Sequence, residues 1–373
     1  MKILYVTTIG STMVFFKELV RDLLDQGHTV DIACNDSIAP VPRCYHEWNC
    51  RVFTLDCART PFSPGNLKAM AKILKLVRDR NYDIVHCHTP VASFCTRLAC
   101  AGLRKQGIRV MYTAHGFHFY AGAPLLNWLL YYPAEKLCAP LTDVLVTINQ
   151  EDYDRAASKL HAKEVVYIPG VGVDIQKFAQ AIVDRDAKRT ALGIPEDAFL
   201  LISVGELNNN KNHQAMIRAM AELNCRNVHY IIAGAGPSEE QLLALADQLG
   251  ISRQLHLLGF RKDVAELYKA ADVFCFPSIR EGLPVSVIEA MAAGLPVISA
   301  INRGTVELVQ ENRNGFLCNC SDISGFAKKI SILQNDPVLR KNMAQASMQK
   351  AEEYRVERIV SLMEQLYTDT AAK

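Results

Sequence analysis

The sequence contains no run of about 18 consecutive apolar residues, which a membrane-spanning helix would need. It also lacks an excess of either charge, because 41 Lys and Arg residues nearly balance 39 Asp and Glu residues. Only 21% of the residues are charged and 50% are hydrophobic, which is typical of a globular protein and excludes a disordered chain. The balanced charge and the absence of a basic tail predict no nucleic-acid partner.

A signal-peptide core is also missing, since the first apolar segment, residues 2–6, is short and no small-residue cleavage site follows it. We therefore expect the protein in the cytoplasm. The twelve cysteines have irregular spacings, and several lie inside apolar strand-like runs. No pair has C-x2-C zinc spacing, so most cysteines are predicted to be small buried hydrophobic residues.

Basic residues are concentrated in one segment. Residues 57–111 hold ten Lys or Arg residues and only two Asp residues, a local net charge of +8. Residues 66–80 have a helical pattern within this segment, which suggests a surface that faces something anionic. The apolar face is expected to carry Leu67, Met70, Leu74 and Val77, and the basic face Lys68, Lys72 and Lys75.

Short apolar runs alternate with amphipathic stretches along the whole chain, as in βαβ units around a parallel sheet. The alternation pauses at Pro169-Gly170-Val171-Gly172-Val173-Asp174, which we interpret as a domain boundary. The predicted fold is α/β, with two doubly wound Rossmann-like domains that face a cleft. The expected domains are residues 1–170 and 171–354. A long helical pattern follows at 337–370, and we expect its end, 355–373, to cross back to the first domain.

The expected elements follow that alternation. The strands are 3–7, 29–33, 52–55, 84–86, 110–113, 144–148, 165–168, 199–204, 228–233, 255–258, 273–276 and 296–299, and the helices are 15–26, 66–80, 91–106, 125–139, 213–223, 239–249, 264–270 and 285–293.

Ligands of such sheets bind beyond the carboxyl ends of the strands, so the loops after the strands are the place to look for chemistry. Neither G-x-G-x-x-G nor G-x4-G-K-[ST] is present, which disfavours a nicotinamide dehydrogenase and a P-loop ATPase. The nearest motif, Gly234-Ala235-Gly236-Pro237, lacks the third glycine. It could still accept a phosphate or a nucleoside, or form a plain turn between a strand and a helix.

The most informative segment is 276–294, where a strand ends, a loop carries Glu281, and a helix begins near Pro284 and stops at Gly294. The positive end of that helix suits a diphosphate. Glu289 in its second turn could accept hydrogen bonds from two vicinal hydroxyls of a ribose, and Glu281 from those of a sugar. The alternative is a solvated Glu281 and an exposed Glu289. The apolar neighbours of Glu289 favour the functional interpretation.

Two D-x-D pairs and two histidine pairs could indicate metal binding. Asp152/Asp154 and Asp184/Asp186 lie in helical or linker patterns, and we interpret them as solvated faces. His86-Cys87-His88 follows a strand without a third ligand at suitable spacing, although His88 could border an acceptor site. His115 and His118 are expected in the cleft, and for His118 a structural role is as plausible as a functional one. No metal and no cofactor are therefore expected.

The E-x7-E spacing of Glu281 and Glu289, with Gly282-Leu283-Pro284 between them, resembles the donor-site motif of retaining GT-B glycosyltransferases of family 4. The resemblance extends over about residues 1–365. Segments 59–64 and 115–120 resemble the branch of bacterial enzymes that assemble exopolysaccharide or capsule repeat units on a lipid carrier. Further segments agree in order: Gly10, 113–116, Val204-Gly205 followed by Lys211, 234–237, 258–261 and 314–316.

The resemblance implies a role for each matching residue. Glu289 would bind the nucleotide ribose, Lys211 would neutralise the departing diphosphate, and His115 would contact the donor sugar near the reacting carbon. The family normally has an arginine where this chain has Glu206. The remaining donor-site residues implied are Gly10, Gly205, Gly234, Phe260, Arg261, Glu281, Gly282, Leu283, Pro284 and Val285.

The function implied is a metal-independent transferase that moves a hexose or N-acetylhexosamine from a UDP-sugar to a polyprenyl-diphosphate-linked acceptor, with retained configuration. It would act as a peripheral protein on the anionic inner face of the cell membrane. Two alternatives stay open: a sugar-nucleotide 2-epimerase of similar fold, and a non-catalytic partner that binds sugar nucleotides and supports another transferase.

Overall fold

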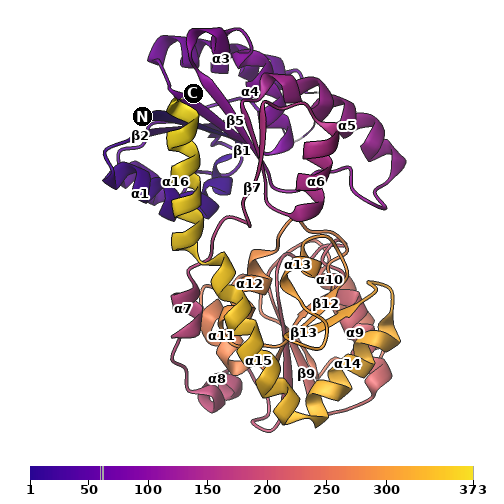
Figure 1. The fold of residues 1–373 in the computed structure, drawn as a ribbon. Coiled ribbons are helices and arrows are strands. Elements are labelled where there is room, and N and C mark those ends of the chain that lie inside the picture. Colours follow the sequence, from indigo (N-terminus) through magenta and orange to yellow (C-terminus); the bar gives the residue numbers. More distant parts are fainter. Residues whose placement is uncertain (59, 61–62, 373) are drawn as a thin grey trace. The chain divides into compact units, whose positions relative to one another are not determined.

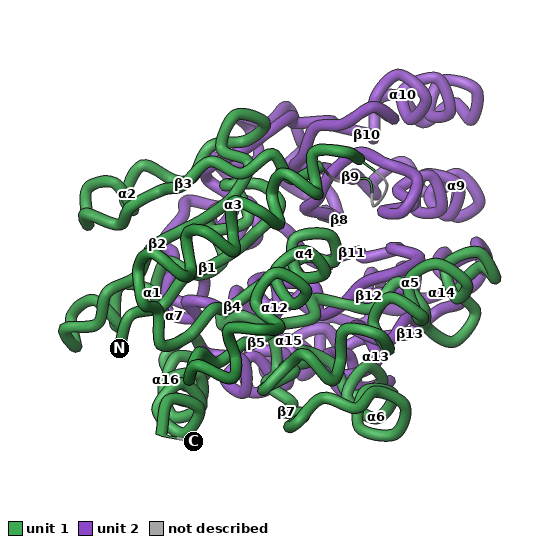
Figure 2. The backbone as a smooth tube through the Cα atoms, turned by 90° about the horizontal axis from the view of Figure 1, so that it is seen from above, with its two compact units in different colours: residues 1–172, 356–373 green, residues 173–355 purple. Residues whose placement is uncertain are grey.

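The computed structural model describes residues 1–58, 60 and 63–372. The chain divides into two compact units, coloured separately in Figure 2. Unit 1 consists of Met1–Gly172 and Val356–Lys373, and unit 2 of Val173–Arg355. Arg59, Pro61 and Phe62 of the segment 59–64, which carried part of the family resemblance, lie outside the described residues.

The described part of unit 1 contains a sheet of seven parallel strands in the order β3-β2-β1-β4-β5-β6-β7, which confirms the strands predicted there (Figure 1). The order reverses between β1 and β4, so the loops after these two strands diverge at the centre of the sheet. The strands are β1 (Lys2–Ile9), β2 (Thr29–Asn35), β3 (Val52–Thr54), β4 (Ile84–His88), β5 (Arg109–Ala114), β6 (Val144–Thr147) and β7 (Glu164–Tyr167).

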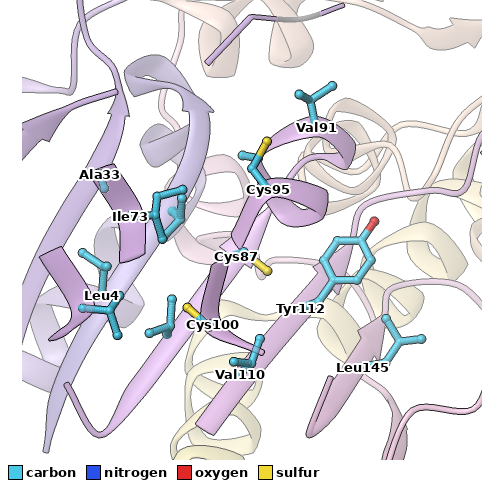
Figure 3. Packing of buried hydrophobic residues seen from close by; sticks show 14 of the residues in the cluster. Leu4, Ala33, Ile73, Cys87, Val91, Cys95, Cys100, Val110, Tyr112 and Leu145 are labelled. Carbon is cyan, nitrogen blue, oxygen red and sulfur yellow. The ribbon is translucent and has the colours of Figure 1, made fainter. Parts of the chain in front are cut away.

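Alternate residues of each strand enter two hydrophobic cores on opposite faces of this sheet. Leu4 and Val6 of β1 lie in the core beneath α3 and α4, where Cys87 and Tyr112 also pack (Figure 3). Ile3 and Tyr5 lie in the other core. The helices of the unit are α1 (Lys17–Asp25), α2 (Arg43–Glu47), α3 (Gly65–Arg80), α4 (Pro90–Cys100), α5 (Leu125–Cys138), α6 (Gln150–Lys159) and α16 (Val356–Ala372).

The C-terminal helix α16 belongs to unit 1, as predicted, and packs beside α1 (Figure 1). Its Tyr367 hydroxyl lies 2.5 Å from the Tyr5 hydroxyl and 2.6 Å from Nδ1 of His86. The prediction of one continuous helix over 337–370 is wrong: α15 (Pro337–Ala351) ends and α16 begins after an extended Arg355. There the Tyr354 carbonyl accepts the Val173 N–H at 3.0 Å instead of continuing a helix.

The described part of unit 2 holds a six-stranded parallel sheet in the order β10-β9-β8-β11-β12-β13. The strands are β8 (Phe199–Val204), β9 (Val228–Ala233), β10 (Leu255–Leu257), β11 (Val273–Phe276), β12 (Val297–Ala300) and β13 (Gly315–Cys318). The order reverses between β8 and β11.

Helices cover both faces of this sheet. They are α7 (Ile175–Ala179), α8 (Arg185–Ala191), α9 (His213–Leu223), α10 (Glu239–Gln248), α11 (Val264–Ala270), α12 (Val285–Ala292), α13 (Thr305–Leu308) and α14 (Ile323–Asn335), besides α15. Helices α9, α10 and α14 cover one face, and α11 and α12 pack on the other, where Tyr268 contacts Phe274.

The apolar face predicted for α3 needs one correction. The helix buries Asn66, Ala69, Ile73 and Val77, whereas Leu67 is 70% exposed. The buried stripe includes Asn66 because its side chain accepts the Ala58 N–H at 3.1 Å, so the start of the helix is anchored to the preceding loop.

All twelve cysteines lie in the described part of the chain as free thiols, and nine of them are buried, as predicted from their apolar surroundings. Across residues 1–58, 60 and 63–372, no helix combines the length and the apolar character that crossing a membrane requires.

Candidate active site

Two predicted site residues meet where the sheet of unit 2 reverses its order. Lys211 lies in the loop after β8 and Glu281 in the loop after β11, and these strands are neighbours. The Lys211 Nζ lies 2.8 Å from Oε1 of Glu281, with the two side chains 19% and 16% exposed. The ammonium also sits 4.8 Å from the centre of the Phe276 ring. A cation is thus held, partly buried, at the carboxyl edge of the sheet.

Two glycines allow the lysine loop to take this path. A Cβ on Gly234 would lie 1.8 Å from the Gly205 carbonyl oxygen, so only glycine allows the two strand-end turns to approach this closely. Gly205 has φ +158° and packs against Lys211, whose Cε would lie 3.2 Å from an added Cβ. Gly205 and Gly234 therefore position the lysine.

An asparagine-rich run around Lys211 connects the two loops, and the sequence analysis did not single it out. Asn210 donates to the Arg280 carbonyl at 3.0 Å, and its own carbonyl accepts the Ile279 N–H at 2.8 Å. Asn212, at φ +53°, donates to the Pro277 carbonyl at 3.2 Å. The signal was visible in the sequence as four asparagines flanking one lysine.

Helix α12 begins at Val285 with Pro284 as its N-terminal cap residue, and Gly294 at φ +87° follows its end. Its first N–H groups have no partner within the helix, so its positive end points toward the loop that carries Glu281. That loop is braced from behind by Arg303, whose Nε donates to the Glu281 carbonyl at 3.0 Å. The predicted residues Gly282 and Leu283 lie in the same turn.

Glu289 lies one turn into α12 and is largely buried, so the alternative of an exposed helix residue is wrong. The Tyr268 hydroxyl donates to Glu289 Oε2 at 3.2 Å. Burial raises the pKa of the Glu289 carboxyl to about 7, against the smaller opposing effect of the Tyr268 hydrogen bond. A carboxyl group whose pKa is raised this far by burial is typical of a functional site.

Two of the predicted donor-site residues, Phe260 and Arg261, lie in the turn after β10. Phe260 is 79% exposed, and the Arg261 guanidinium forms two hydrogen bonds with Asp263, at 2.8 and 2.6 Å. The Gly234 N–H donates to the Gly259 carbonyl at 2.8 Å, which joins this turn to the other strand-end loops. The Arg261 side chain is thus already paired with Asp263.

The other predicted donor-site residues, Gly10 and His115, lie in unit 1. A Cβ on Gly10 would lie 2.4 Å from the Val41 amide nitrogen, so packing within the unit already requires glycine there. The half-buried His115 has its Nε2 3.2 Å from Nδ1 of His88. Burial lowers the pKa of His115 to about 4, so its imidazole is neutral at pH 7.

The segment after His115 is anchored by α6, and this corrects the interpretation of Asp152 as solvated. Asp152 is buried and accepts the Phe117 N–H at 3.0 Å and the Asn149 amide at 2.8 Å. Asp154, by contrast, is exposed as expected. The ring of His118 stacks 4.5 Å from that of Tyr131, which gives it a structural contact.

Within the described ranges, no group of three or more His, Cys, Asp or Glu side chains is arranged to hold a metal ion. His86 has Thr113 and Tyr367 as hydrogen-bond partners, so its ring nitrogens are occupied by the packing of unit 1.

Comparison with known proteins identifies the family. The family described as "Glycosyl transferases group 1" matches residues 184–350, and "Glycosyltransferase Family 4" matches residues 14–177. A Bacillus subtilis protein named EpsD and described as a glycosyltransferase is 40% identical over 320 residues, which cover 85% of this chain and 84% of that protein. The chain belongs to glycosyltransferase family 4.

Other relatives of this family 4 glycosyltransferase carry more specific names. The Escherichia coli UDP-Gal:alpha-D-GlcNAc-diphosphoundecaprenol alpha-1,3-galactosyltransferase is 31% identical over 282 residues, 74% of this chain and 72% of that protein. The structure of Anabaena HepE in complex with UDP superimposes with a TM-score of 0.83 at 21% identity over 99% of this chain and 100% of HepE. WaaG, a lipopolysaccharide glycosyltransferase, gives 0.76 at 18% identity over 97% and 98%. These likenesses show that the fold is GT-B.

Glu206 is where this family 4 enzyme departs from the expected pattern. The side chain is exposed and accepts a hydrogen bond from the Asn208 amide at 3.0 Å. No ion pair is recorded for Glu206 with any described residue. The Glu206 carboxylate is thus solvated and held by Asn208 alone among the hydrogen bonds described.

Proposed function

We propose that this glycosyltransferase moves a hexose or N-acetylhexosamine from a UDP-sugar to a polyprenyl-diphosphate-linked acceptor, with retention of configuration and without a metal ion. The observation that carries the proposal is the pairing of Lys211 with Glu281 at the positive end of α12, with Glu289 buried in the same helix. Breaking a glycosyl–phosphate bond builds negative charge on the leaving diphosphate. Lys211 and the helix end supply fixed positive charge for it.

In this proposal each carboxylate has a separate task. Glu289 accepts the two ribose hydroxyls, and Glu281, oriented by Lys211 and Arg303, accepts hydroxyls of the transferred sugar. The neutral His115 contributes a hydrogen bond near the reacting carbon instead of a charge. Retention is proposed from the resemblance of the Glu281–Glu289 motif to retaining enzymes.

The names of similar proteins support the donor and the acceptor. HepE has been solved with UDP and with UDP-glucose, and the E. coli relative is named for an acceptor on undecaprenol diphosphate. Exopolysaccharide assembly is proposed from the branch of the family that segments 59–64 and 115–120 resemble.

Incubation with radiolabelled UDP-sugars and a membrane lipid extract tests the proposal. We expect label in the lipid phase, and the same rate in the presence of EDTA. Free sugar plus UDP would instead indicate an epimerase, and UDP-sugar binding without turnover a non-catalytic partner. Loss of activity in EDTA with rescue by Mn²⁺ or Mg²⁺ would overturn metal independence alone.

The buried carboxyl of Glu289 predicts a pH dependence of donor binding. Its raised pKa of about 7 means that the ionised form, which accepts ribose hydroxyls, is lost as pH falls through 7. Affinity for UDP-glucose should therefore drop about tenfold between pH 8 and pH 6. Calorimetric titration measures this, and Glu289→Gln should show weaker but pH-independent affinity over the same range. A wild-type affinity that does not change with pH would contradict the ribose assignment.

Restoring the family arginine should strengthen binding of the diphosphate. Glu206→Arg changes the local charge by two units beside Gly205 and breaks no ion pair recorded among the described residues. We expect UDP to bind roughly tenfold more tightly at low salt, with an unchanged melting temperature. Unimproved affinity in a stably folded variant would show that position 206 does not face the phosphates.

We further propose that unit 1 docks reversibly on the anionic inner leaflet. Lys68, Lys72 and Lys75 are all exposed on α3, as predicted, and α5 exposes several leucines. Two features of the structure limit this docking face. Arg97 and Arg104 are paired with carboxylates, which reduces the free charge of the segment. Trp128 packs against the core beside Phe119 and so does not form the docking face. The exposed leucines are Leu125, Leu126, Leu129, Leu130 and Leu137.

Vesicle flotation tests this docking. The wild type should float with anionic vesicles and much less with neutral ones, because each basic residue near such a surface contributes about 1 kcal/mol. A Lys68/Lys72/Lys75→Glu variant should lose most of the difference. Equal flotation of variant and wild type on anionic vesicles would show that this face of α3 does not dock.

A further inference from the structure

We propose that the groove between α4 and α5 holds the first isoprenoid units of the acceptor, with the diphosphate at the adjoining carboxyl edge of β1 and β4. This inference rests on the proposed function, since it assigns the lipid part of the proposed acceptor to particular residues of unit 1. It concerns only residues of unit 1 and needs no residue of unit 2.

The groove is a cavity of about 240 Å³ formed by one face of each helix. Residues four apart lie on the same face of a helix, so Pro90 and Phe94 of α4 meet Leu130 and Ala134 of α5 across it. Val91 and Tyr131 complete the apolar wall. A helical peptide, about 10–12 Å across, is too wide for a space of this size, whereas a thin hydrocarbon chain fits it.

The two charged groups in the wall of this cavity, Arg97 and Glu135, are already paired. Arg97 NH1 lies 2.8 Å from Oε2 of the buried Glu135, and its Nε donates to the Ser93 carbonyl at 3.1 Å. The Tyr112 hydroxyl donates to the other Glu135 oxygen at 3.1 Å. The pair therefore leaves no uncompensated charge in the wall, and the groove offers a ligand apolar contact.

A second cavity of about 240 Å³ adjoins the first and shares Pro90, Val91 and Tyr131 with it. It opens at the carboxyl ends of β1 and β4, where the order of the sheet reverses and ligands of α/β sheets bind. Its wall is mixed: apolar side chains contribute the larger part, and the polar groups are the hydroxyls of Thr8, Thr12 and Thr89 and the imidazole of His118. The Thr8 and Thr89 hydroxyls lie 2.6 Å apart and hydrogen-bond to each other.

The two cavities together select the chemistry of the occupant. One end offers hydrogen-bonding groups at the sheet edge, and the other offers an apolar groove whose wall includes Leu130, one of the exposed leucines of α5. A ligand with a phosphorylated head joined directly to a branched hydrocarbon chain matches both. A polyprenyl diphosphate has that structure, and the rest of its chain would continue past α5 into the bilayer.

Farnesyl diphosphate is a soluble probe for this groove, with three isoprene units and no sugar. The full-length wild type should bind it about tenfold more tightly than inorganic diphosphate, as measured by calorimetry. Ala134→Trp fills the cavity and should lower the affinity for farnesyl diphosphate about tenfold while leaving that for inorganic diphosphate unchanged. Leu137→Trp, which adds the same ring on the exposed side of α5, is the matched control and should change neither.

Two results would overturn the assignment. One is equal affinity of the wild type and Ala134→Trp for farnesyl diphosphate. The other is an affinity of the wild type for myristate equal to its affinity for farnesyl diphosphate. A melting temperature equal to that of the wild type shows that the Ala134→Trp variant is folded. The transfer assay separates this inference from the proposed function. If the wild type labels the lipid but Ala134→Trp binds farnesyl diphosphate as tightly as the wild type, the groove assignment is wrong and the proposed function stands. If no sugar is transferred to lipid, the proposed function fails, and the farnesyl diphosphate affinities still test the groove.

Discussion

Replacement of Lys211 by methionine is expected to lower the turnover number by roughly 10²–10³, about 2.7–4 kcal/mol, which is the usual cost of removing a fixed donor from a developing negative charge. The side chain is held 2.8 Å from Glu281, and losing it leaves that carboxylate uncompensated beside the diphosphate. The variant should therefore also bind UDP more weakly. Initial rates at saturating donor, together with calorimetry of UDP, measure the two effects separately.

A double variant distinguishes the two contributions. Lys211→Met/Glu281→Gln removes the unpaired carboxylate, so UDP affinity should recover while turnover stays low. The exposed Lys262 in the same unit gives a matched control, and Lys262→Met should leave both quantities unchanged. If Lys211→Met raised only the Michaelis constant at constant turnover number, the lysine would bind the ground state without assisting departure of the diphosphate.

The loops that carry this chemistry could be predicted because local signals mark them. Lys211 follows an apolar strand, and Glu281 follows another apolar strand and precedes a Pro-initiated helix. Strand length, turn residues and helix periodicity are properties of short segments, so the sequence exposes them directly. That β8 and β11 are neighbours follows from the doubly wound topology, in which the first strand lies at the reversal of the sheet order.

Three features of the structure could not be predicted from the sequence, because they depend on contacts between distant segments. Asp152 has a helical, polar neighbourhood in the sequence, and only the approach of Phe117, 35 residues away, makes it a buried acceptor. The break before α16 depends on the hydrogen bond between Val173 and Tyr354. The groove between α4 and α5 depends in the same way on two helices that are 24 residues apart in the chain.

Glu289→Ala is expected to weaken UDP binding by about 2–4 kcal/mol, because in the proposed function it removes charge-assisted hydrogen bonds to two ribose hydroxyls. Glu281→Ala should lower turnover more than it lowers UDP affinity, because the hydroxyls that we assign to it belong to the transferred sugar. UDP calorimetry and initial rates on both variants test this opposite order of effects. The exposed Glu240 of the same unit supplies the control, and Glu240→Ala should alter neither.

Burial of the Glu289 carboxyl also makes misfolding a poor explanation for a loss of UDP affinity in Glu289→Ala. Its pKa is raised in the folded state, so the stability linked to it is fully present below the unfolded-state pKa near 4.5 and is lost as pH rises through about 7. At pH 8 the ionised, buried carboxylate therefore destabilises the fold, and removing it should leave the melting temperature unchanged or higher. A protein that keeps such a group sacrifices stability for a function that needs it. Unchanged UDP affinity in a Glu289→Ala variant of equal or greater stability would remove the ribose role from Glu289.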